Sequence, residues 1–337
     1  DCIFEDNRGV WGGAYQCWGG TKDTFYNCSF INNQSSVSGG AITAQLNSEI
    51  TLENCKFQNN NAVYGGAIFL EQSARFTGMN NIYNGNQADS GAVVHLIGGS
   101  RFEGYNSLFI QNIADDDGGA FYIDSGSILL HNSIMSNNSA VNNINIGGDT
   151  TFVSISYTIS DEMWPGVGNQ NATPLFVDID GIDNIPGNDD DDFYLQIGSP
   201  GINRGDTLMM YLDLFDRNSN GDSSELFPYD LDENPRIYGD SIDIGAFEFQ
   251  GPNSVPDGFQ FLPTAYPNPT NGDLTIDLGK VLNQVDVRII NLLGQEITSV
   301  QAVSGHQVKI NFAGASGIYI VNLTTEVGAS TFRVMKR

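Results

Sequence analysis

The chain has 337 residues, of which 40% are hydrophobic, and a formal net charge of −26 at pH 7. This size allows more than one domain, and no run of about twenty apolar residues exists that could span a membrane. So large an acidic excess argues against nucleic acid and anionic lipid as partners, and is compatible with cations, neutral glycans or simple extracellular solubility.

The first 140 residues repeat one phrase. An aromatic residue is followed three positions later by Asn, and a Gly-Ala element comes next. The successive Asn residues lie 26, 27, 26, 26 and 26 positions apart, at Asn7, Asn33, Asn60, Asn86, Asn112 and Asn138. A second Asn column leads the units, at Asn27, Asn54, Asn80, Asn106 and Asn132. A fixed period of this length indicates a repeat architecture.

Each unit contains short segments rich in Phe, Tyr, Ile and Val, separated by Gly and Asn, which favour strands and tight turns over helices. A single unit is too small to bury a core, so the units must stack. We therefore predict an all-β fold that begins with a right-handed parallel β-helix (a solenoid) over residues 1–160, with one unit per coil. The Asn columns should lie at bends, where stacked amides can bond from coil to coil.

Repeat positions then predict which side chains share a wall. Cys2, Cys28 and Cys55 occupy one position and should stack, as buried free thiols rather than a disulfide. Arg75 and Arg101 should lie side by side. We expect alternate positions after each Ala to point inward: Tyr15, Ile42, Ile68, Val93 and Phe121, followed by Cys17, Ala44, Leu70, His95 and Ile123. His95 is thus expected to be a core histidine.

The repeated FxxN and GGA-[I/L/V] motifs resemble those of chlamydial polymorphic membrane proteins and related bacterial surface β-helices. The resemblance implies an exported surface protein, often an adhesin. A coil that starts at the first residue leaves a bare strand edge. We therefore expect either further sequence upstream or an unusual cap.

The repeat fades after about residue 141, and residues 161–250 hold twenty Asp and Glu but only three basic residues. Two stretches, "LQIGSPGINRGD" (195–206) and "DLDENPRIYGDSIDIGAFEFQ" (230–250), resemble the closing region of secreted β-helix proteins of the choice-of-anchor class. The resemblance implies that residues 161–250 close and cap the β-helix and have no catalytic role.

Two acidic segments are candidate Ca²⁺ sites, because oxygen ligands at alternate positions suit this hard cation. The first candidate set is Asp213, Asp216, Asn218, Asn220, Asp222 and Glu225. The second is Asp178, Asp180, Asp183 and Asp189. The first loop lacks an acid at its twelfth position, which is Phe227, and both segments could also be solvated surface turns.

The composition changes at residues 251–263, which are expected to form a linker, and residues 264–337 alternate as in a small antiparallel β-sandwich. "YPNPTNGDLTIDL", "VRIINLLGQEI", "GIYIVNL" and "TFRVMKR" occur in order and resemble the type A sorting domain of the type IX secretion system of Bacteroidetes. The resemblance implies export to the outer-membrane surface of a Gram-negative bacterium or release, with the translocon and shuttle proteins as partners of residues 264–337.

These features favour a secreted or cell-surface protein that is a non-enzymatic adhesin or structural rod, with a glycan or a host or cell-surface ligand. The alternatives are a polysaccharide lyase, a glycoside hydrolase or a carbohydrate-binding β-helix. An enzyme would need two carboxylates about a scissile bond, or a base beside a cation. The repeats offer only a few candidates: Arg75, Arg101, Glu71, Glu103 and Asp124.

Overall fold

The computed structural model describes residues 1–337 apart from 189, 214–215, 239–240, 252–263, 292–293 and 326–327. The chain divides into two compact units, Asp1–Gly251 and Pro252–Arg337. All but the first residue of the expected linker, 251–263, lies outside the described residues. The described part of the chain has two short 3₁₀ helices, η1 (Thr150–Phe152) and η2 (Thr207–Met209), and its remaining regular structure is β-strand.

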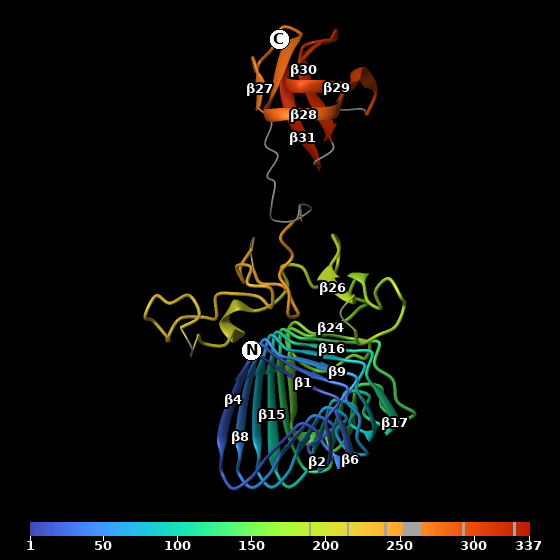
Figure 1. Cartoon of the computed structure of the whole chain (residues 1–337), viewed down its shortest axis with the longest axis vertical. Coiled ribbons are helices and arrows are strands. Elements are labelled where there is room, and N and C mark those ends of the chain that lie inside the picture. Colours follow the sequence, from blue (N-terminus) through green and yellow to red (C-terminus); the bar gives the residue numbers. More distant parts are fainter. Residues whose placement is uncertain (189, 214–215, 239–240, 252–263, 292–293, 326–327) are drawn as a thin grey trace. The chain divides into compact units, whose positions relative to one another are not determined.

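Parallel strands of successive coils stack into long sheets in the first unit, as predicted for a parallel β-helix (Figure 1). Sheet A has the order β1 (Cys2–Glu5), β5 (Cys28–Ile31), β9 (Lys56–Gln58), β12 (Ile82–Asn84), β16 (Leu108–Ile110), β20 (Ile134–Ser136), β23 (Ile159–Ser160) and β24 (Gln170–Asn171). Sheet B is short and consists of β2 (Arg8–Trp11) with β6 (Gln34–Ser38), and β13 (Gln87–Ser90) with β17 (Ile113–Asp117). Isolated bridges of Asn61 and Tyr64 connect the two pairs.

Two further sheets complete each coil. Sheet C contains β3 (Tyr15–Cys17), β7 (Ile42–Ala44), β10 (Ile68–Leu70), β14 (Val94–Leu96), β18 (Phe121–Ile123) and β21 (Ile146–Gly148). Sheet D contains β4 (Lys22–Tyr26), β8 (Glu49–Glu53), β11 (Arg75–Met79), β15 (Ser100–Tyr105), β19 (Gly126–His131) and β22 (Val153–Ser156). The register pairs Cys2 with Cys28 and Arg75 with Arg101, as the repeat positions predict. Cys28 and Cys55 are buried free thiols as expected, but Cys2, in the first coil, is a free thiol that is exposed.

The two Asn columns do different work. From Asn7 to Asn112, each Asn of the first column donates its side-chain amide to the side-chain oxygen of its equivalent one coil on, as Asn60 does to Asn86 at 2.9 Å. The same amide also donates to a main-chain carbonyl, here that of Phe30. The second column, Asn27, Asn54, Asn80, Asn106 and Asn132, has φ between 47° and 54°. Left-handed backbone is tolerated by Asn, which explains its recurrence at this corner.

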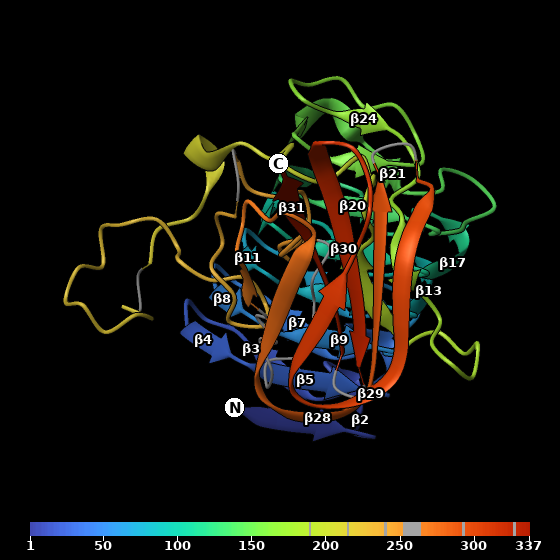
Figure 2. The ribbon, with the colours of Figure 1, turned by 90° about the horizontal axis from the view of Figure 1, so that it is seen from above.

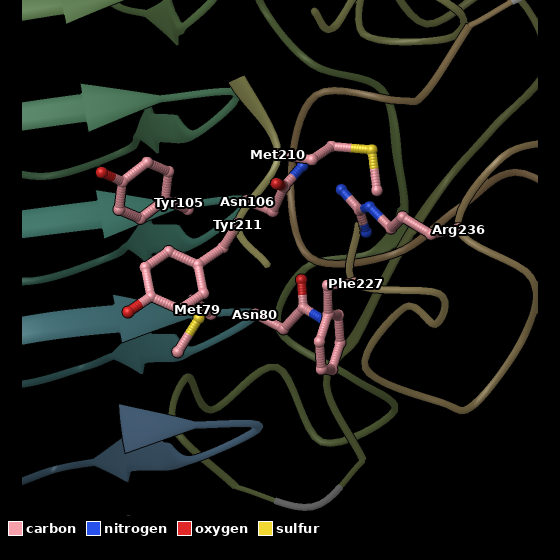
Figure 3. Close-up of a pocket in the computed structure, with 8 residues that line it drawn as sticks. All are labelled: Met79, Asn80, Tyr105, Asn106, Met210, Tyr211, Phe227 and Arg236. Atoms are coloured by element: carbon pink, nitrogen blue, oxygen red, sulfur yellow. The ribbon is translucent and has the colours of Figure 1, made fainter. Parts of the chain in front are cut away.

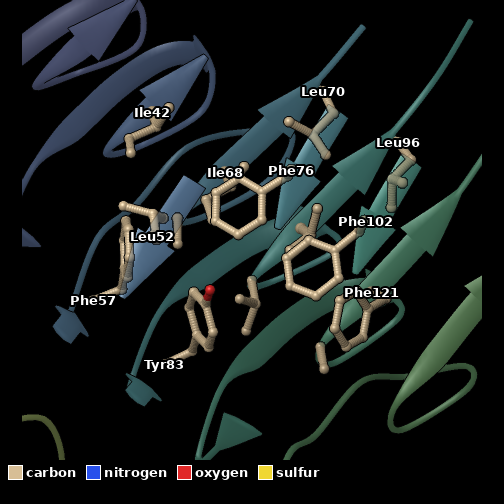
Figure 4. Close-up of a cluster of buried hydrophobic side chains, with 14 of the residues drawn as sticks. Ile42, Leu52, Phe57, Ile68, Leu70, Phe76, Tyr83, Leu96, Phe102 and Phe121 are labelled. Atoms are coloured by element: carbon tan, nitrogen blue, oxygen red, sulfur yellow. The ribbon is translucent and has the colours of Figure 1, made fainter. Parts of the chain in front are cut away.

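The core is a stack of like side chains (Figure 4). Neighbouring rings in the column Phe30, Phe57, Tyr83 and Phe109 are stacked with centroids 4.6, 5.1 and 4.8 Å apart. Phe76 and Phe102 of sheet D stack in the same way at 4.9 Å. These aromatic residues of the repeat therefore form the interior that no single unit could bury.

The register of one coil differs from the prediction. The structure pairs Val94 with Ile68 and His95 with Phe69, so Leu96 points inward and His95 does not. The cause is the turn before β14: Gly91 takes the left-handed position (φ 64°) that Gly65 takes one coil earlier. This coil therefore has Ala92 where the earlier coil has its second glycine, Gly66. Aligning the Ala residues of the repeats, as the prediction did, displaces the predicted register of this coil by one residue.

The closing region, residues 161–250, mainly covers the lateral side of the β-helix. Trp164 packs on the main core, and β24 adds to the end of sheet A. Most of the rest, including β25 (Phe176–Asp178) and β26 (Asp192–Leu195), turns back over the outer side of sheet A, whereas residues 210–213 and 216–227 lie against sheet D. Apolar residues of both parts form one cluster there, which includes Ile82, Leu108, Ile134, Ile159, Phe193, Leu195, Ile244 and Phe247.

The second unit is one antiparallel sheet of five strands (Figure 2). They are β27 (Thr264–Tyr266), β28 (Asp273–Asn291), β29 (Glu296–Asn311), β30 (Gly317–Thr325) and β31 (Gly328–Lys336). The sheet curls nearly into a barrel around its own core. The two predicted apolar faces both lie in the long strand β28 and are buried: Leu274, Ile276, Leu278, Val285, Val287 and Ile289.

Candidate functional sites

The first predicted calcium loop uses most of its oxygens internally. Both oxygens of the Asp213 carboxylate share the main-chain N–H of Arg217. The carboxylate of Asp216 accepts from the main-chain N–H of Gly221 in the same way. Glu225 Oε1 accepts from the side-chain amides of Asn218 and Asn220, at 2.6 and 2.8 Å. Asp222 caps the following turn by accepting from Ser224.

This loop is anchored on sheet D. Arg217 Nε lies 3.3 Å from Glu53 Oε1, and the guanidinium sits 3.6 Å above the ring of Tyr26. Burial raises the pKa of the Glu53 carboxyl to about 7, and the negative charge of nearby Asp213 adds to the rise. Arg217 is thus held by an ion pair and a cation–π contact. Residues 210–213 and 216–227 form a lateral strap on sheet D.

The second acidic segment docks on sheet A. The Asn84 amide donates to Asp191 Oδ2 at 2.6 Å, and Asp191 also accepts from the main-chain N–H groups of Gly187 and Asn188. Two oxygens there, Asn84 Oδ1 and Asp191 Oδ1, are buried without a hydrogen-bond partner among the described residues.

Several predicted ligands of that segment already have partners within it. Asp183 accepts from the Ile185 N–H and the Asn188 amide, Asp178 pairs with Asp192 between β25 and β26, and Asp189 lies outside the described residues. Within the part of the chain that the structure describes, no three His, Cys, Asp or Glu side chains are grouped so as to hold a metal ion. Calcium binding at either segment stays a prediction.

A buried charge cluster, which the motif alone did not predict, holds the end of the closing region. The Arg236 guanidinium is 1% exposed and donates to the carbonyls of Ala246 and Gly245. Three buried acids surround it. Asp230 accepts from the Glu248 N–H, Asp243 accepts from the Phe249 N–H, and Glu248 accepts from the Asp243 N–H.

The acids outnumber Arg236, and their burial has electrostatic consequences. Burial raises the pKa of the Glu248 carboxyl to about 8, with a further rise from Asp243 that Arg236 only partly offsets. Arg236 also borders a cavity of about 10 Å³, the size of roughly one water molecule, between the strap and sheet D (Figure 3). Its other walls are Met79, Asn80, Tyr105, Asn106, Met210, Tyr211 and Phe227. The cluster closes the fold and leaves no room for a substrate.

The outer side of sheet D carries an exposed charge ladder. Arg75 and Arg101 are neighbours, as predicted, and Arg101 pairs with Glu103 through Nε and Oε1 at 2.5 Å. Lys22 and Glu49 make a similar pair at 2.6 Å. Exposed pairs of this kind contribute little to stability. Of the other predicted candidates, Glu103 lies on this ladder, whereas Glu71 and Asp124 follow β10 and β18 of sheet C.

The outer side of sheet C carries aromatic rings instead. Phe69, His95 and Tyr122 occupy one column of this sheet. The His95 ring lies 5.5 Å from Phe69, 4.9 Å from Tyr122 and 5.2 Å from Tyr64 of the neighbouring sheet B column. Burial lowers the pKa of His95 to about 4, so the ring is neutral at physiological pH. The sequence analysis missed this group because it placed His95 inside.

Comparison with known families matches both units. A model described as a right handed beta helix region matches residues 1–112, and a secretion system C-terminal sorting domain matches residues 264–337. No curated protein matches the chain significantly. Among the described residues, no helix has the length and apolar character that crossing a membrane requires.

Proposed function

Because this chain is a β-helix protein with a C-terminal sorting domain of the type IX secretion system, and is therefore secreted or exposed at the cell surface, we propose that it is a non-enzymatic adhesin or structural protein. We further propose that it comes from a Bacteroidetes species, with the translocon and shuttle proteins of that system as partners of residues 264–337. Its β-helix would be the part that acts after export.

The observation that carries the proposal is the continuity of the outer columns. Sheets B and C present side chains in register over several coils, such as Trp11 and Tyr64 in one column and Gln45, Glu71 and Asp124 in another. A linear display of this kind suits contact with an extended or surface-bound ligand. A hydrolase or lyase instead needs its groups gathered at one point.

The perturbed carboxyl groups support the same conclusion. Among the described acids, the raised pKa values belong to Glu53, Glu162, Asp191, Asp230, Asp243 and Glu248. All six lie in the closing region or against it, and burial is the main cause in each case. Most of them accept hydrogen bonds from main-chain N–H groups, which is a structural role. Perturbed acids of a catalytic pair would be expected to face a cleft.

A labelled whole chain, incubated with intact cells and with insoluble polysaccharides, tests the proposal. We expect saturable attachment to at least one of these surfaces, which heat-unfolded chain does not show. Attachment that never saturates, or that unfolded chain shows equally, would contradict an adhesin. A structural rod would instead attach to the producing cell alone.

A further inference from the structure

We propose that the outer side of sheet C binds a neutral polysaccharide that runs along the β-helix axis. The inference rests on the proposed function and names the ligand class of the adhesin. The binding surface consists of three outward columns, which we call the aromatic face. The first is Trp11, Ser38, Tyr64, Ser90 and Asp117, the second is Gln16, Thr43, Phe69, His95 and Tyr122, and the third is Trp18, Gln45, Glu71, Ile97 and Asp124.

The aromatic face is open in part: Ser38, Thr43, Phe69, Ser90 and His95 are at most 7% exposed, but the rings around them reach solvent. The outer side of sheet A is covered by another segment. The closing region covers sheet A through an apolar cluster and reaches sheet D at Glu53. Sheet C receives no such cover within the described residues of the first unit. Large rings remain accessible on it: Trp18 is 66% exposed, Trp11 44% and Tyr64 42%.

The spacing of the rings follows the coils. Trp11 and Tyr64 share a column and lie two coils apart, and the half-buried Tyr122 lies two coils beyond Tyr64 in the adjacent column. Since paired strands are about 4.8 Å apart, two coils measure about 10 Å along the axis. That interval is comparable to a disaccharide of an extended glycan, so successive rings can each meet an equivalent sugar face.

The rings between these positions form a firm base. His95 touches Phe69, Tyr64 and Tyr122, while Ser90 Oγ lies 3.3 Å from its Nδ1. Thr43 is tied to the Ser38 carbonyl at 2.9 Å. Rigid aromatic side chains give contact area at low entropic cost, which favours binding of a flat apolar sugar face.

Hydrogen-bonding groups border the rings. Gln45 donates to Glu71 Oε2 at 2.7 Å and accepts from Gln16 at 3.4 Å, so these side chains form a polar line beside the aromatic column. Asp124, which lies two coils beyond Glu71 in the same column, is exposed. Amides and carboxylates can exchange such bonds for bonds to sugar hydroxyls.

The charge of the aromatic face favours one class of polysaccharide over another. The three columns, all of which the structure describes, contain Glu71, Asp117 and Asp124 but no Lys or Arg. His95 adds no positive charge, since burial lowers its pKa to about 4. An acidic surface repels uronate or sulfated chains. A neutral polysaccharide is therefore favoured over an acidic one.

The test is equilibrium binding of the whole chain to neutral polysaccharides (β-glucan, xylan and galactomannan) and to acidic ones (alginate and polygalacturonate). The variant Tyr64→Ala/Tyr122→Ala removes two rings of the aromatic face. Its matched control, Arg75→Ala/Arg101→Ala, removes two exposed side chains from sheet D of the same β-helix. A second variant, Trp11→Ala, changes an exposed ring of the first coil, and thermal unfolding checks that each variant folds.

We expect binding to at least one neutral polysaccharide, with a dissociation constant raised roughly tenfold or more in the two-tyrosine variant and raised in Trp11→Ala. The arginine control should bind like the parent chain. Binding that the aromatic variants leave unchanged would overturn the site, and preference for acidic polysaccharide would overturn the ligand class. Attachment to cells without binding to any polysaccharide would overturn this inference and leave the proposed function standing. No attachment to either would remove both.

Discussion

The coils and the closing region satisfy their buried polar groups in opposite ways. In the coils, each Asn of the buried ladder meets an identical Asn one coil away, as Asn86 meets Asn112. In the closing region, the single buried arginine Arg236 donates to carbonyl groups and lies among buried acids, and this cluster is not repeated among the described residues. Replacing one Asn of the repeated ladder therefore removes one of many equivalent hydrogen-bonded contacts. A loss in the single-copy cluster leaves several buried groups without compensation.

The largest expected effect follows from the single-copy cluster. Arg236→Met removes the donor to the carbonyls of Ala246 and Gly245 and the positive charge near the buried acids Asp230, Asp243 and Glu248. Leaving buried charge without its compensating partner costs about 3–5 kcal/mol. We expect a large fall in the unfolding temperature and early proteolysis between residues 172 and 250. Limited proteolysis with mass spectrometry locates the cleavage. The exposed Arg204→Met is the control, and equal resistance of both variants would contradict the role of Arg236.

A smaller effect is expected in the repeated ladder. Asn86→Ala removes the amide that donates to the Phe57 carbonyl and to Asn112 Oδ1, and an unpaired buried group costs about 1–3 kcal/mol. Urea unfolding monitored by circular dichroism measures the change. The exposed Asn142→Ala should leave stability unchanged. A fall as large as that of Arg236→Met would remove the contrast between the two regions.

The two regions should also respond to pH with opposite sign. Glu248 has a pKa near 8 in the folded chain against an ordinary value of 4.5. Its contribution to the free energy of unfolding is therefore complete below pH 4.5 and is lost as pH rises to about 8. His95 has a pKa near 4 against 6.5, so its stabilisation is complete above pH 6.5 and is lost as pH falls to about 4.

Unfolding temperatures of the parent chain, Glu248→Gln and His95→Phe between pH 4 and 8 separate these contributions. Glu248→Gln should flatten the loss at high pH, because an amide stays neutral. His95→Phe should flatten the loss at low pH while it retains contact with Phe69 and Tyr122. Profiles that match the parent chain in both variants would show that neither group controls the pH dependence.

The smallest expected effect is that of Ca²⁺. A cation bound only by the folded chain stabilises it by about 1.4 kcal/mol at tenfold excess over its dissociation constant. We predict a saturable rise in unfolding temperature that chelation reverses. Asp216→Asn tests the loop of residues 213–225, and Asp183→Asn tests the second predicted site, Asp178, Asp180, Asp183 and Asp189. No shift on addition or chelation would discard both predicted sites.

The repeat made much of the β-helix predictable. The column of Cys2, Cys28 and Cys55 and the neighbouring Arg75 and Arg101 follow from period alone, because parallel strands pair identical positions. The displaced register of His95 was not predicted, since Ala92 replaced the second Gly and gave two possible alignments. A count of residues from Gly91 instead of from Ala92 would have placed His95 outside.

The path of the closing region could not be predicted from its own sequence, because its contacts are aperiodic. A signal existed in the coils. The first outward position of sheet A changes along the β-helix from Ser29 and Lys56 to Ile82, Leu108 and Ile134. An outward column that becomes apolar indicates a face that another segment covers. Phe193, Leu195, Ile244 and Phe247 of the closing region pack in one cluster with this column, which explains the change.

The most direct test of the central claim is a turnover measurement. The whole chain is incubated with the neutral and acidic polysaccharides, with and without Ca²⁺, and new reducing ends, unsaturated products and bound protein are followed together. A non-enzymatic binding protein predicts retained protein and no products at any time. Products that accumulate in proportion to protein would contradict it and would establish a hydrolase or lyase.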